Sequence, residues 1–290
     1  METRILSNNH LEAFVQWMHV EEKSSATCEK YLRDIRRFKE YAADESVSKE
    51  VVARWKNELI AQGYAVRSIN SMLASVNSLL MFMGWEDCKV KNIRLQHQTF
   101  SPEEKELTKA EYQRLLQASE GDEQTNLILQ RICATGIRVS ELQYFTVGAM
   151  KQGQVIVNCK GKIRTILVPG KLKRMLLHYA KRLKLHFGPI FQNGKGEPMD
   201  RSVIWRRMKR LCQAAKVQAS KVFPHNLRKL FARTYYRIGK DIAQLADVLG
   251  HSSINTTRIY SMNSGTEHRQ NMERLGLVVW EKRRQNKKVT

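Results

Sequence analysis

The pattern that most constrains this fold is a hairpin set in a chain whose other apolar residues recur at helical spacing. Residues 154–169, QVIVNCKGKIRTILVP, are apolar or alternating on both sides of Lys160-Gly161-Lys162, as in two short strands joined by a tight turn. Residues 1–93 instead predict helices, because apolar residues recur every three or four positions between basic ones. We therefore expect a mainly α protein with one small antiparallel sheet, whose turn exposes Lys160.

The N-terminal segment has the pattern of a basic helical bundle. Its most regular stretch is residues 31–42, YLRDIRRFKEYA. There the apolar residues recur at helical spacing and predict one buried helix face, made of Tyr31, Ile35, Phe38 and Tyr41. The remaining faces of that helix carry Arg33, Arg36, Arg37 and Lys39. Two further helices are predicted to end at Gly63 and Gly84, because glycine accepts the left-handed backbone that ends many helices.

A polar stretch separates this bundle from the rest of the chain. Residues 94–106, RLQHQTFSPEEKE, lack apolar periodicity and contain a proline among charges, so they predict an interdomain linker. Thr108 followed by Glu111 has the spacing of a capping box, which predicts a helix that opens a second domain over residues 107–290. The total length also favours about two domains.

Net charge indicates the kind of partner. The chain holds 50 Lys and Arg against 28 Asp and Glu, with a net charge of +22, and such a protein is expected to bind a polyanion. The basic residues of the bundle named above are therefore candidate ligands of DNA phosphates, and so are Lys162 and Arg164 of the hairpin.

Several other classes of protein fit poorly. The five cysteines contain no C-x-x-C pair, so neither a disulfide framework nor a zinc site is expected. The N-terminus has no signal-peptide pattern, and no run approaches the ~20 apolar residues of a membrane span. We therefore expect a protein of a reducing, cytoplasmic compartment with no membrane contact.

Residue types that suit phosphate chemistry occur in favourable local settings in the second domain. A helix is predicted to break at Gly136, with a new helix starting near Arg138 in the sequence TGIRVSEL. Pro224 suits the first turn of a helix that carries His225 and Arg228 on one face.

The next two helices are expected to end at Gly239 and Gly250. The second of these glycines opens the sequence GHSSINTTRIY, which contains His251 and Tyr260. These two residues complete a set whose order and settings together suggest one reaction centre.

Arginines are the natural clamps for a phosphodiester under attack, because negative charge builds on its non-bridging oxygens. Arg138 and Arg228 are our candidates, since a guanidinium stays charged and binds phosphate through two parallel hydrogen bonds. Loss of one such donor is expected to slow the reaction by about 10²–10³. The helix start that carries His225 and Arg228 adds a favourable dipole.

Tyr260 is the candidate nucleophile. A phenol ordinarily titrates near ~10, so it needs a base or a stabilised phenolate to attack at neutral pH, and His225 is the candidate base. The departing sugar oxygen needs a proton, for which Lys160 on the hairpin turn is the candidate acid, with Lys162 as the alternative.

Two more residues are assigned supporting roles. His251 is expected to donate a hydrogen bond to the phosphate and to restrain the intermediate. Glu141, one turn past Arg138, either orients a histidine, anchors the arginine, or is a plain helix-surface residue.

With these motifs in place, the second domain resembles the catalytic domain of tyrosine site-specific recombinases, the phage integrase family, over about residues 106 to 265. The bundle resembles that family's SAM-like core-binding domain. The resemblance implies that Tyr260 forms a 3′-phosphotyrosine bond, with Arg138, His225, Arg228 and His251 around the phosphate and Lys160 as acid. Because the covalent link preserves the phosphodiester energy, neither a metal nor a cofactor is implied. The chain departs from many members at Lys229, where they carry histidine.

The resemblance also implies the partners: specific sites in double-stranded DNA held in a C-shaped clamp, and a homotetramer at the synapse formed from free monomers. The apolar C-terminal segment around residues 275–280 is then expected to dock on a neighbouring protomer, or alternatively to pack on its own domain. Because the bundle begins near Met1, we expect an Xer-like or mobile-element recombinase without an arm-binding domain.

Two rival functions have distinguishable consequences. A type IB topoisomerase uses similar chemistry to relax DNA without exchanging strands. A sequence-specific DNA-binding protein would keep the fold without cutting, although it would need neither the tyrosine nor the histidines.

Overall fold

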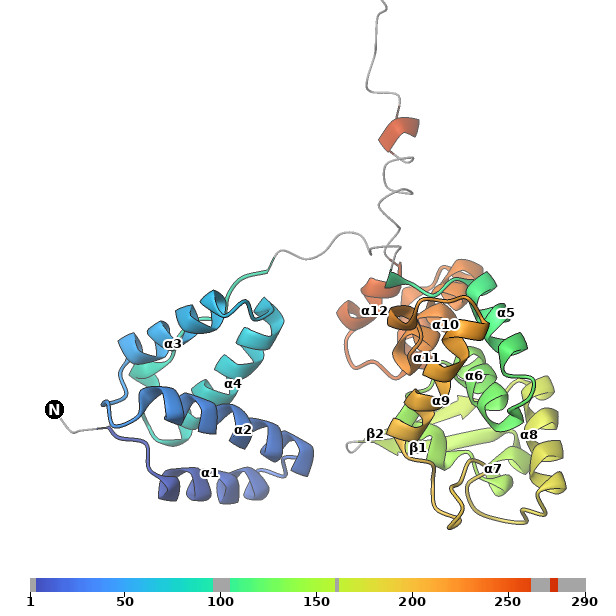
Figure 1. The fold of residues 1–290 in the computed structure, drawn as a ribbon, viewed down its shortest axis with the longest axis horizontal. Helices are drawn as coiled ribbons and strands as arrows, with labels where there is room; N and C mark the ends of the chain where they lie inside the picture. The colour runs from blue at the N-terminus through green and yellow to red at the C-terminus, as the bar shows by residue number, and fades with distance from the viewer. Residues whose placement is uncertain (1–3, 96–104, 160–161, 262–271, 276–290) are drawn as a thin grey trace, which may run out of the picture. The chain divides into compact units, whose positions relative to one another are not determined.

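The computed structural model describes residues 4–95, 105–159, 162–261 and 272–275. The chain divides into two compact units, Met1–His97 and Gln98–Thr290, each with its own core (Figure 1). Most of the predicted linker, the turn residues Lys160 and Gly161, and most of the C-terminal segment lie outside the described residues.

The N-terminal unit is a bundle of four helices with one short 3₁₀ turn. Its elements are α1 (Asn8–Val20), α2 (Ser25–Ala42), α3 (Lys49–Ala61), α4 (Val66–Phe82) and η1 (Glu86–Cys88). Serine hydroxyls cap the first three helices, at Ser7, Ser24 and Ser48. The two glycines predicted to end helices, Gly63 and Gly84, each lie just past the end of a helix, and both have a positive φ.

One prediction about α2 was wrong. Ile35 and Phe38 are fully buried, as expected, but Tyr41 is 39% exposed. The buried face continues through Ala42 instead, because a step of four residues from Phe38 keeps the helix on the bundle side. The same face also buries Asp34, which the apolar spacing did not indicate.

Over its described residues the C-terminal unit is mainly helical, with one two-stranded sheet. Its helices are α5 (Lys109–Ala118), α6 (Glu123–Thr135), α7 (Val147–Gln152), α8 (Gly170–Arg182), α9 (Arg201–Ala214), α10 (Pro224–Gly239), α11 (Ile242–Leu249) and α12 (Ile254–Ser261). Its 3₁₀ helices are η3 (Val139–Tyr144) and η4 (Ala219–Lys221), and its strands are β1 (Gln154–Cys159) and β2 (Lys162–Leu167). The capping box of Thr108 and Glu111 opens α5 as predicted.

The predicted hairpin is confirmed. β1 and β2 pair antiparallel, from Gln154 opposite Leu167 to Cys159 opposite Lys162. Alternation divides the two faces: Val155 and Val157 are buried, while Leu167 is exposed. The sheet therefore packs one face on the domain core and leaves the other open.

Helix ends position the residues that follow them. α6 ends at Gly136 (φ 62°) and α11 ends at Gly250 (φ 65°), a left-handed backbone that favours glycine. The prediction that a helix ends at Gly239 is confirmed: α10 ends there, and the next residue, Lys240, takes the left-handed position with φ 50°. Asp241 follows at once and caps α11, so the chain must turn at Lys240.

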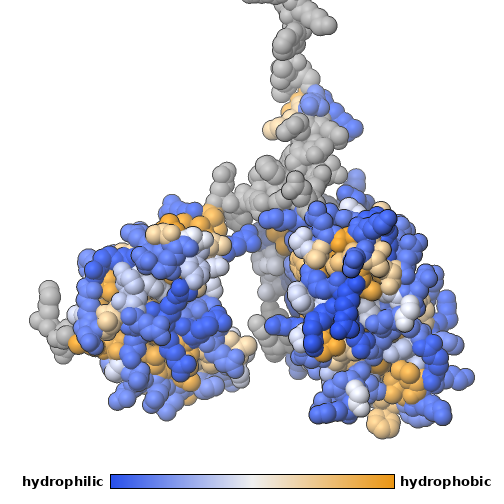
Figure 2. Space-filling view, in the orientation of Figure 1, coloured by the Kyte–Doolittle hydropathy of each residue, from blue (hydrophilic) through white to orange (hydrophobic). Residues whose placement is uncertain are grey.

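No helix among the described residues is long and apolar enough to cross a membrane. In the view of Figure 2 both units present mostly hydrophilic side chains, with apolar ones scattered among them. Within the four described residues of the C-terminal segment, Met272 and Leu275 are 69% and 64% exposed. The predicted docking of this segment otherwise concerns residues outside the described part.

Candidate active site

Arg228 lies at the centre of the polar cluster. Pro224 starts α10, so Arg228 falls in the second turn and points into the domain with 3% exposure. Its guanidinium donates to the carbonyls of Gly136 and of Leu249, the latter at 2.8 Å, and lies 3.0 Å from His251 Nε2. Burial and the nearby Arg138 lower the pKa of Arg228 to about 10, so it remains a cation at neutral pH.

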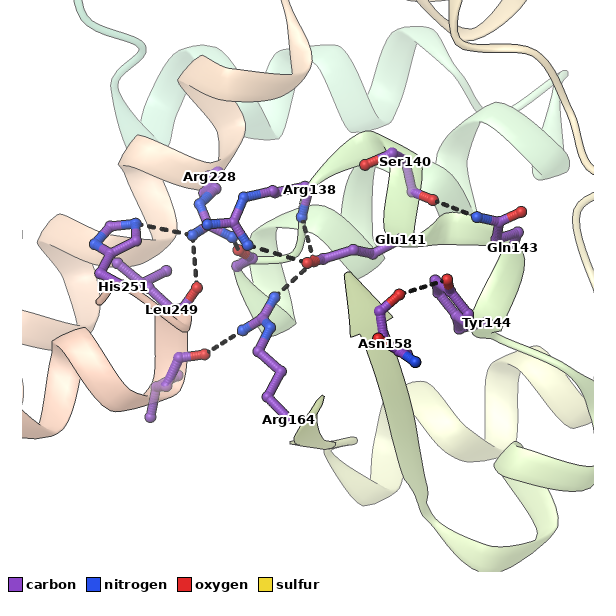
Figure 3. Close-up of polar contacts among 12 residues, drawn as sticks. Arg138, Ser140, Glu141, Gln143, Tyr144, Asn158, Arg164, Arg228, Leu249 and His251 are labelled. Carbon is purple, nitrogen blue, oxygen red and sulfur yellow. Dashed lines mark hydrogen bonds and ion pairs between the residues drawn. The ribbon is translucent and has the colours of Figure 1, made fainter. Parts of the chain in front are cut away.

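Arg138 and Glu141 form a second pair beside Arg228 (Figure 3). Arg138 caps the 3₁₀ helix η3, and its Nη1 lies 3.1 Å from Glu141 Oε1 while its backbone N–H donates to Oε2 at 2.8 Å. Glu141 is 1% exposed, whereas the Arg138 side chain is 40% exposed. Glu141 therefore contacts arginine, which is one of the predicted alternatives, and leaves Arg138 open to a ligand.

Both ring nitrogens of His251 form hydrogen bonds within the protein. Its Nε2 faces Arg228, which can only donate, so Nε2 accepts and the proton lies on Nδ1, 2.9 Å from the Thr257 hydroxyl. Burial and the arginine cations lower the pKa of His251 to about 4. The ring is neutral at pH 7, and as arranged here Nε2 does not donate.

Tyr260 lies next to this histidine. α12 carries it into a cluster with Leu245 and Leu249, where it is 4% exposed, and its ring stacks on His251 with centroids 6.0 Å apart. Its phenol is close enough to Arg228 to raise the pKa of that arginine, against the larger effect of burial. The chain segments around Gly136, Gly250 and Tyr260 thus meet at one guanidinium.

His225 is exposed at the start of α10. Partial desolvation, followed by the cations Lys229, Arg228 and Arg138, lowers its pKa below the ordinary value. It is therefore neutral at pH 7 and able to accept a proton.

The cluster has more positive than negative charge. Three arginines, Arg138, Arg164 and Arg228, surround the one carboxylate of Glu141, which leaves two positive charges in excess. The described residues contain no group of three or more His, Cys, Asp or Glu that could hold a metal ion. Such a cluster is suited to an anion that enters from the open side of Arg138.

Comparison with known proteins identifies the family. Residues 105–267 match the Phage integrase family, and residues 11–87 match the Phage integrase N-terminal SAM-like domain. The chain belongs to the phage integrase family. The first of these matches covers more than half of the chain and contains the whole cluster described above.

Relatives of known class match most of the length of this family member. The tyrosine recombinase XerA of Pyrococcus furiosus is 27% identical over 288 residues, covering 96% of this chain and 98% of that protein. The tyrosine recombinase XerD of Pseudomonas aeruginosa is 30% identical over 260 residues, covering 81% and 86%. The predicted membership of the tyrosine recombinases, a class that cleaves and rejoins DNA, is confirmed.

Solved structures show the same fold at lower identity. A lambda integrase dimer bound to a core site superposes with a TM-score of 0.71 at 18% identity, covering 95% of this chain and 98% of that one. XerH recombinase bound to its difH substrate superposes with a TM-score of 0.67 at 18% identity, covering 92% and 85%. The expected mainly helical architecture with a small antiparallel sheet is confirmed.

The other predicted site residues of this recombinase belong to β2, to α2 of the N-terminal unit, or to the part of the chain that is not described. Lys160 is not among the described residues, and Lys162 contributes the first residue of β2. On α2, Arg33 and Arg36 are exposed, Arg37 donates to the Tyr64 hydroxyl at 2.6 Å, and Lys39 donates to an amide oxygen of α1 at 2.7 Å.

Sequence reasoning missed two features of the site. Thr257 is fully buried and holds His251, and its only signal was its position one turn before Tyr260 on the same helix. Arg164 was predicted to contact DNA phosphate, but its guanidinium binds inside the protein, to Glu141 and to the carbonyl of Val248.

Proposed function

We propose that this chain is a site-specific DNA recombinase in which Tyr260 cleaves one strand and forms a 3′-phosphotyrosine link. The observation that carries the proposal is the meeting of Arg138, Arg228 and His251 beside Tyr260, with an excess of positive charge and one open side. A phosphodiester supplies the anion that this arrangement lacks.

The chemistry balances without any further reactant. The Tyr260 oxygen attacks phosphorus and gives its proton to neutral His225, while the bond from phosphorus to the 5′ oxygen breaks. Lys160 protonates that oxygen as it leaves. Arg138 and Arg228 stabilise the charge on the non-bridging oxygens, which is the role expected of fixed donors in a partly buried site. Rejoining follows the same steps in reverse, with a 5′-hydroxyl of the partner strand as nucleophile.

His251 acts through a change of partner. Its Nε2 accepts from Arg228 in the structure described above. When a phosphate oxygen takes that donor, Nε2 is released, and it contacts the phosphate only if it is itself protonated. The negative phosphate favours that protonation, because it opposes the cations that lower the pKa of His251.

Double-stranded DNA is the proposed partner of both units. We assign residues 1–93 to a core-binding domain, 94–106 to a linker and 107–290 to the catalytic domain with a C-terminal docking segment. The exposed cations of α2 support phosphate contact by the first domain. Monomers would assemble as a homotetramer on two specific sites in the cytoplasm.

The decisive experiment traps the covalent intermediate. Wild type is incubated with a nicked suicide half-site, selected from the flanks of its own element, and the products are separated under denaturing conditions. A covalent protein–DNA band is expected from wild type and none from Tyr260→Phe. Tyr236→Phe is the matched control, because it removes another hydroxyl beside the same cluster and should keep the band.

Each rival function gives a different result in that experiment. Wild type that binds its site but never forms the band would be a non-catalytic DNA-binding protein. Relaxation of a supercoiled plasmid that lacks any specific site, by a monomer, would instead support a type IB topoisomerase.

A modified substrate identifies the acid. A 5′-bridging sulfur leaves without protonation, so it should restore cleavage by Lys160→Ala, whose loss on normal DNA is expected to be about 10²–10⁴. Lys162→Ala is the control and should cleave both substrates normally. Rescue of Lys162→Ala in its place would assign the acid to Lys162.

A further inference from the structure

The guanidinium of Arg164 joins three separate segments of the catalytic unit (Figure 3). Arg164 lies on β2, two residues after its start. Its Nη2 donates to Glu141 Oε2 of η3 at 2.6 Å, and its Nη1 donates to the carbonyl of Val248 on α11 at 2.6 Å. The hairpin, the Arg138 segment and the segment before His251 are thereby held by one side chain.

Gly250 allows this close approach. A Cβ built on Gly250 would lie 2.5 Å from Arg164 Cδ and 2.9 Å from its Nε, which is closer than side-chain atoms pack. The glycine also has a positive φ of 65°, which ends α11 and turns the chain directly into His251. Arg164 therefore packs against the residue that sets the direction of His251.

The setting of Arg164 differs from that of a phosphate ligand. Its side chain is 15% exposed, against 40% for Arg138. Both terminal nitrogens already donate within the protein, and its Nε is buried without a hydrogen-bond partner among the described residues. A phosphate would have to displace a carboxylate that is itself 1% exposed, and removing such a partner leaves a buried charge without compensation.

We infer that Arg164 is a positioning residue: it fixes Glu141 against Arg138 and fixes the α11–α12 connection against the sheet, so that Arg138 and His251 face one phosphate. The planar fork of arginine suits this task, because its nitrogens can bind a carboxylate and a carbonyl in fixed directions at once. The inference rests on the proposed function and adds to it the residue that assembles the phosphate site.

Cleavage and DNA binding separate the two possible roles. In Arg164→Met the rate of adduct formation at saturating DNA is expected to fall about 10²-fold, the cost of misplacing reacting groups by about 1 Å. The salt dependence of DNA binding should not change. If Arg164 contacted a phosphate, the slope of log K against log salt would fall by about 1. That smaller slope, with a normal rate at saturating DNA, would overturn the inference.

Two further variants control for charge and for folding. Arg174→Met removes an exposed arginine from α8 and should leave the rate at saturating DNA unchanged. Arg164→Lys keeps the positive charge, but one ammonium does not reproduce the two-directional fork, so most of the rate should still be lost. Full activity of Arg164→Lys would show that geometry is not the function of Arg164. Melting curves verify that each variant is folded.

A measurement without DNA keeps this test independent of the proposed function. Arg164 is one of the cations that lower the pKa of His251, after burial, Arg228 and Arg138. The pKa of His251, measured by NMR titration, should therefore rise from about 4 in Arg164→Met and stay unchanged in Arg174→Met. If the pKa of His251 did not change in Arg164→Met, Arg164 would not lie against the His251 segment, and the inference would be overturned. Wild type that never cleaves DNA would instead overturn the proposed function.

Discussion

Both units of this recombinase bury charged side chains, and they balance them in opposite ways. In the N-terminal unit the buried carboxylate of Asp34 lies 2.8 Å from Lys30 Nζ and accepts from Ser75 at 3.0 Å. In the C-terminal unit the single carboxylate of Glu141 lies among three arginines. Inside the fold Asp34 is paired with one ammonium, because the second cation beside it, Arg33 at 3.5 Å, is 75% exposed to solvent. The Glu141 cluster is left with excess positive charge.

The difference separates charges that hold a fold from charges that serve a ligand. The Asp34 cluster links α2 to α4, and its oppositely charged partners compensate one another. The cluster around Glu141 tolerates mutual repulsion among its cations, which contributes to the lowered pKa of Arg228. Excess charge of this kind costs stability, and it is expected where an anion binds.

The strongest test of this difference removes one clamp at a time. Arg138→Ala and Arg228→Ala should each lower the rate of adduct formation at saturating DNA by about 10²–10³. Arg228→Ala should also lower the melting temperature, because it leaves the carbonyls of Gly136 and Leu249 without their donor. Arg174→Ala, which removes an exposed arginine from α8, serves as the control and should cleave at the normal rate. Near-normal cleavage by either clamp variant would remove it from the site.

Much of this arrangement could be predicted from local sequence. The hairpin follows from period-two alternation, the end of α6 from Gly136, and the start of α5 from its capping box. The residue types for phosphate chemistry lie in motifs short enough to recognise without a structure. Tyr41 was mispredicted because the buried face of α2 continues through Ala42 once the helix packs in the bundle.

The contacts that assemble the site were beyond such reasoning. Arg164 and Val248 are 84 residues apart in the chain, and no local pattern reports their pairing. On sequence alone a cation on a hairpin of a basic protein favours DNA contact, so Arg164 was assigned to phosphate. Burial of its partner Glu141 is a tertiary property that a spacing of three residues from Arg138 does not reveal.

Substitution in the Asp34 cluster should have the opposite effect from substitution of Arg138 or Arg228: it should lower stability and leave the rate of cleavage almost unchanged. Asp34→Ala is expected to destabilise the N-terminal unit by about 1–3 kcal/mol, because it leaves Lys30 and Ser75 without their buried partner. The rate of adduct formation at saturating DNA should stay within about threefold of wild type. Calorimetry measures the first effect and the suicide substrate the second. A large loss of rate in a folded variant would contradict the division between structural and ligand-binding charge.

Arg131 extends the comparison, because it is a buried cation that pairs with no carboxylate among the described residues. It is fully buried between the rings of Phe145 and Phe191, 4.0 and 4.4 Å from their centroids, and burial lowers its pKa well below the usual range. Arg131→Met keeps the length and removes the charge, so stability should change by no more than about 1 kcal/mol. Chemical denaturation would measure this. A loss of several kcal/mol would mean that the aromatic faces compensate the cation as fully as a carboxylate would.

The smallest expected effect is the response of the charged cluster to pH. The pKa of His251 is about 4 in the folded protein against an ordinary 6.5, so as pH falls below 6.5 the unfolded chain binds a proton first. The stability contributed by neutral His251 is therefore complete above pH 6.5 and is lost as pH falls toward about 4. His251→Gln should reduce the fall in melting temperature between pH 7 and pH 4.5 by a few degrees, roughly 2–4 °C per kcal/mol. The lowered pKa of His225 acts in the same direction, so part of the decline should remain.

His178→Gln, which replaces an exposed histidine on α8, is the matched control and should follow wild type at every pH. Identical declines for His251→Gln and wild type would mean that neither burial nor the arginine cations lower the pKa of this ring in the folded protein.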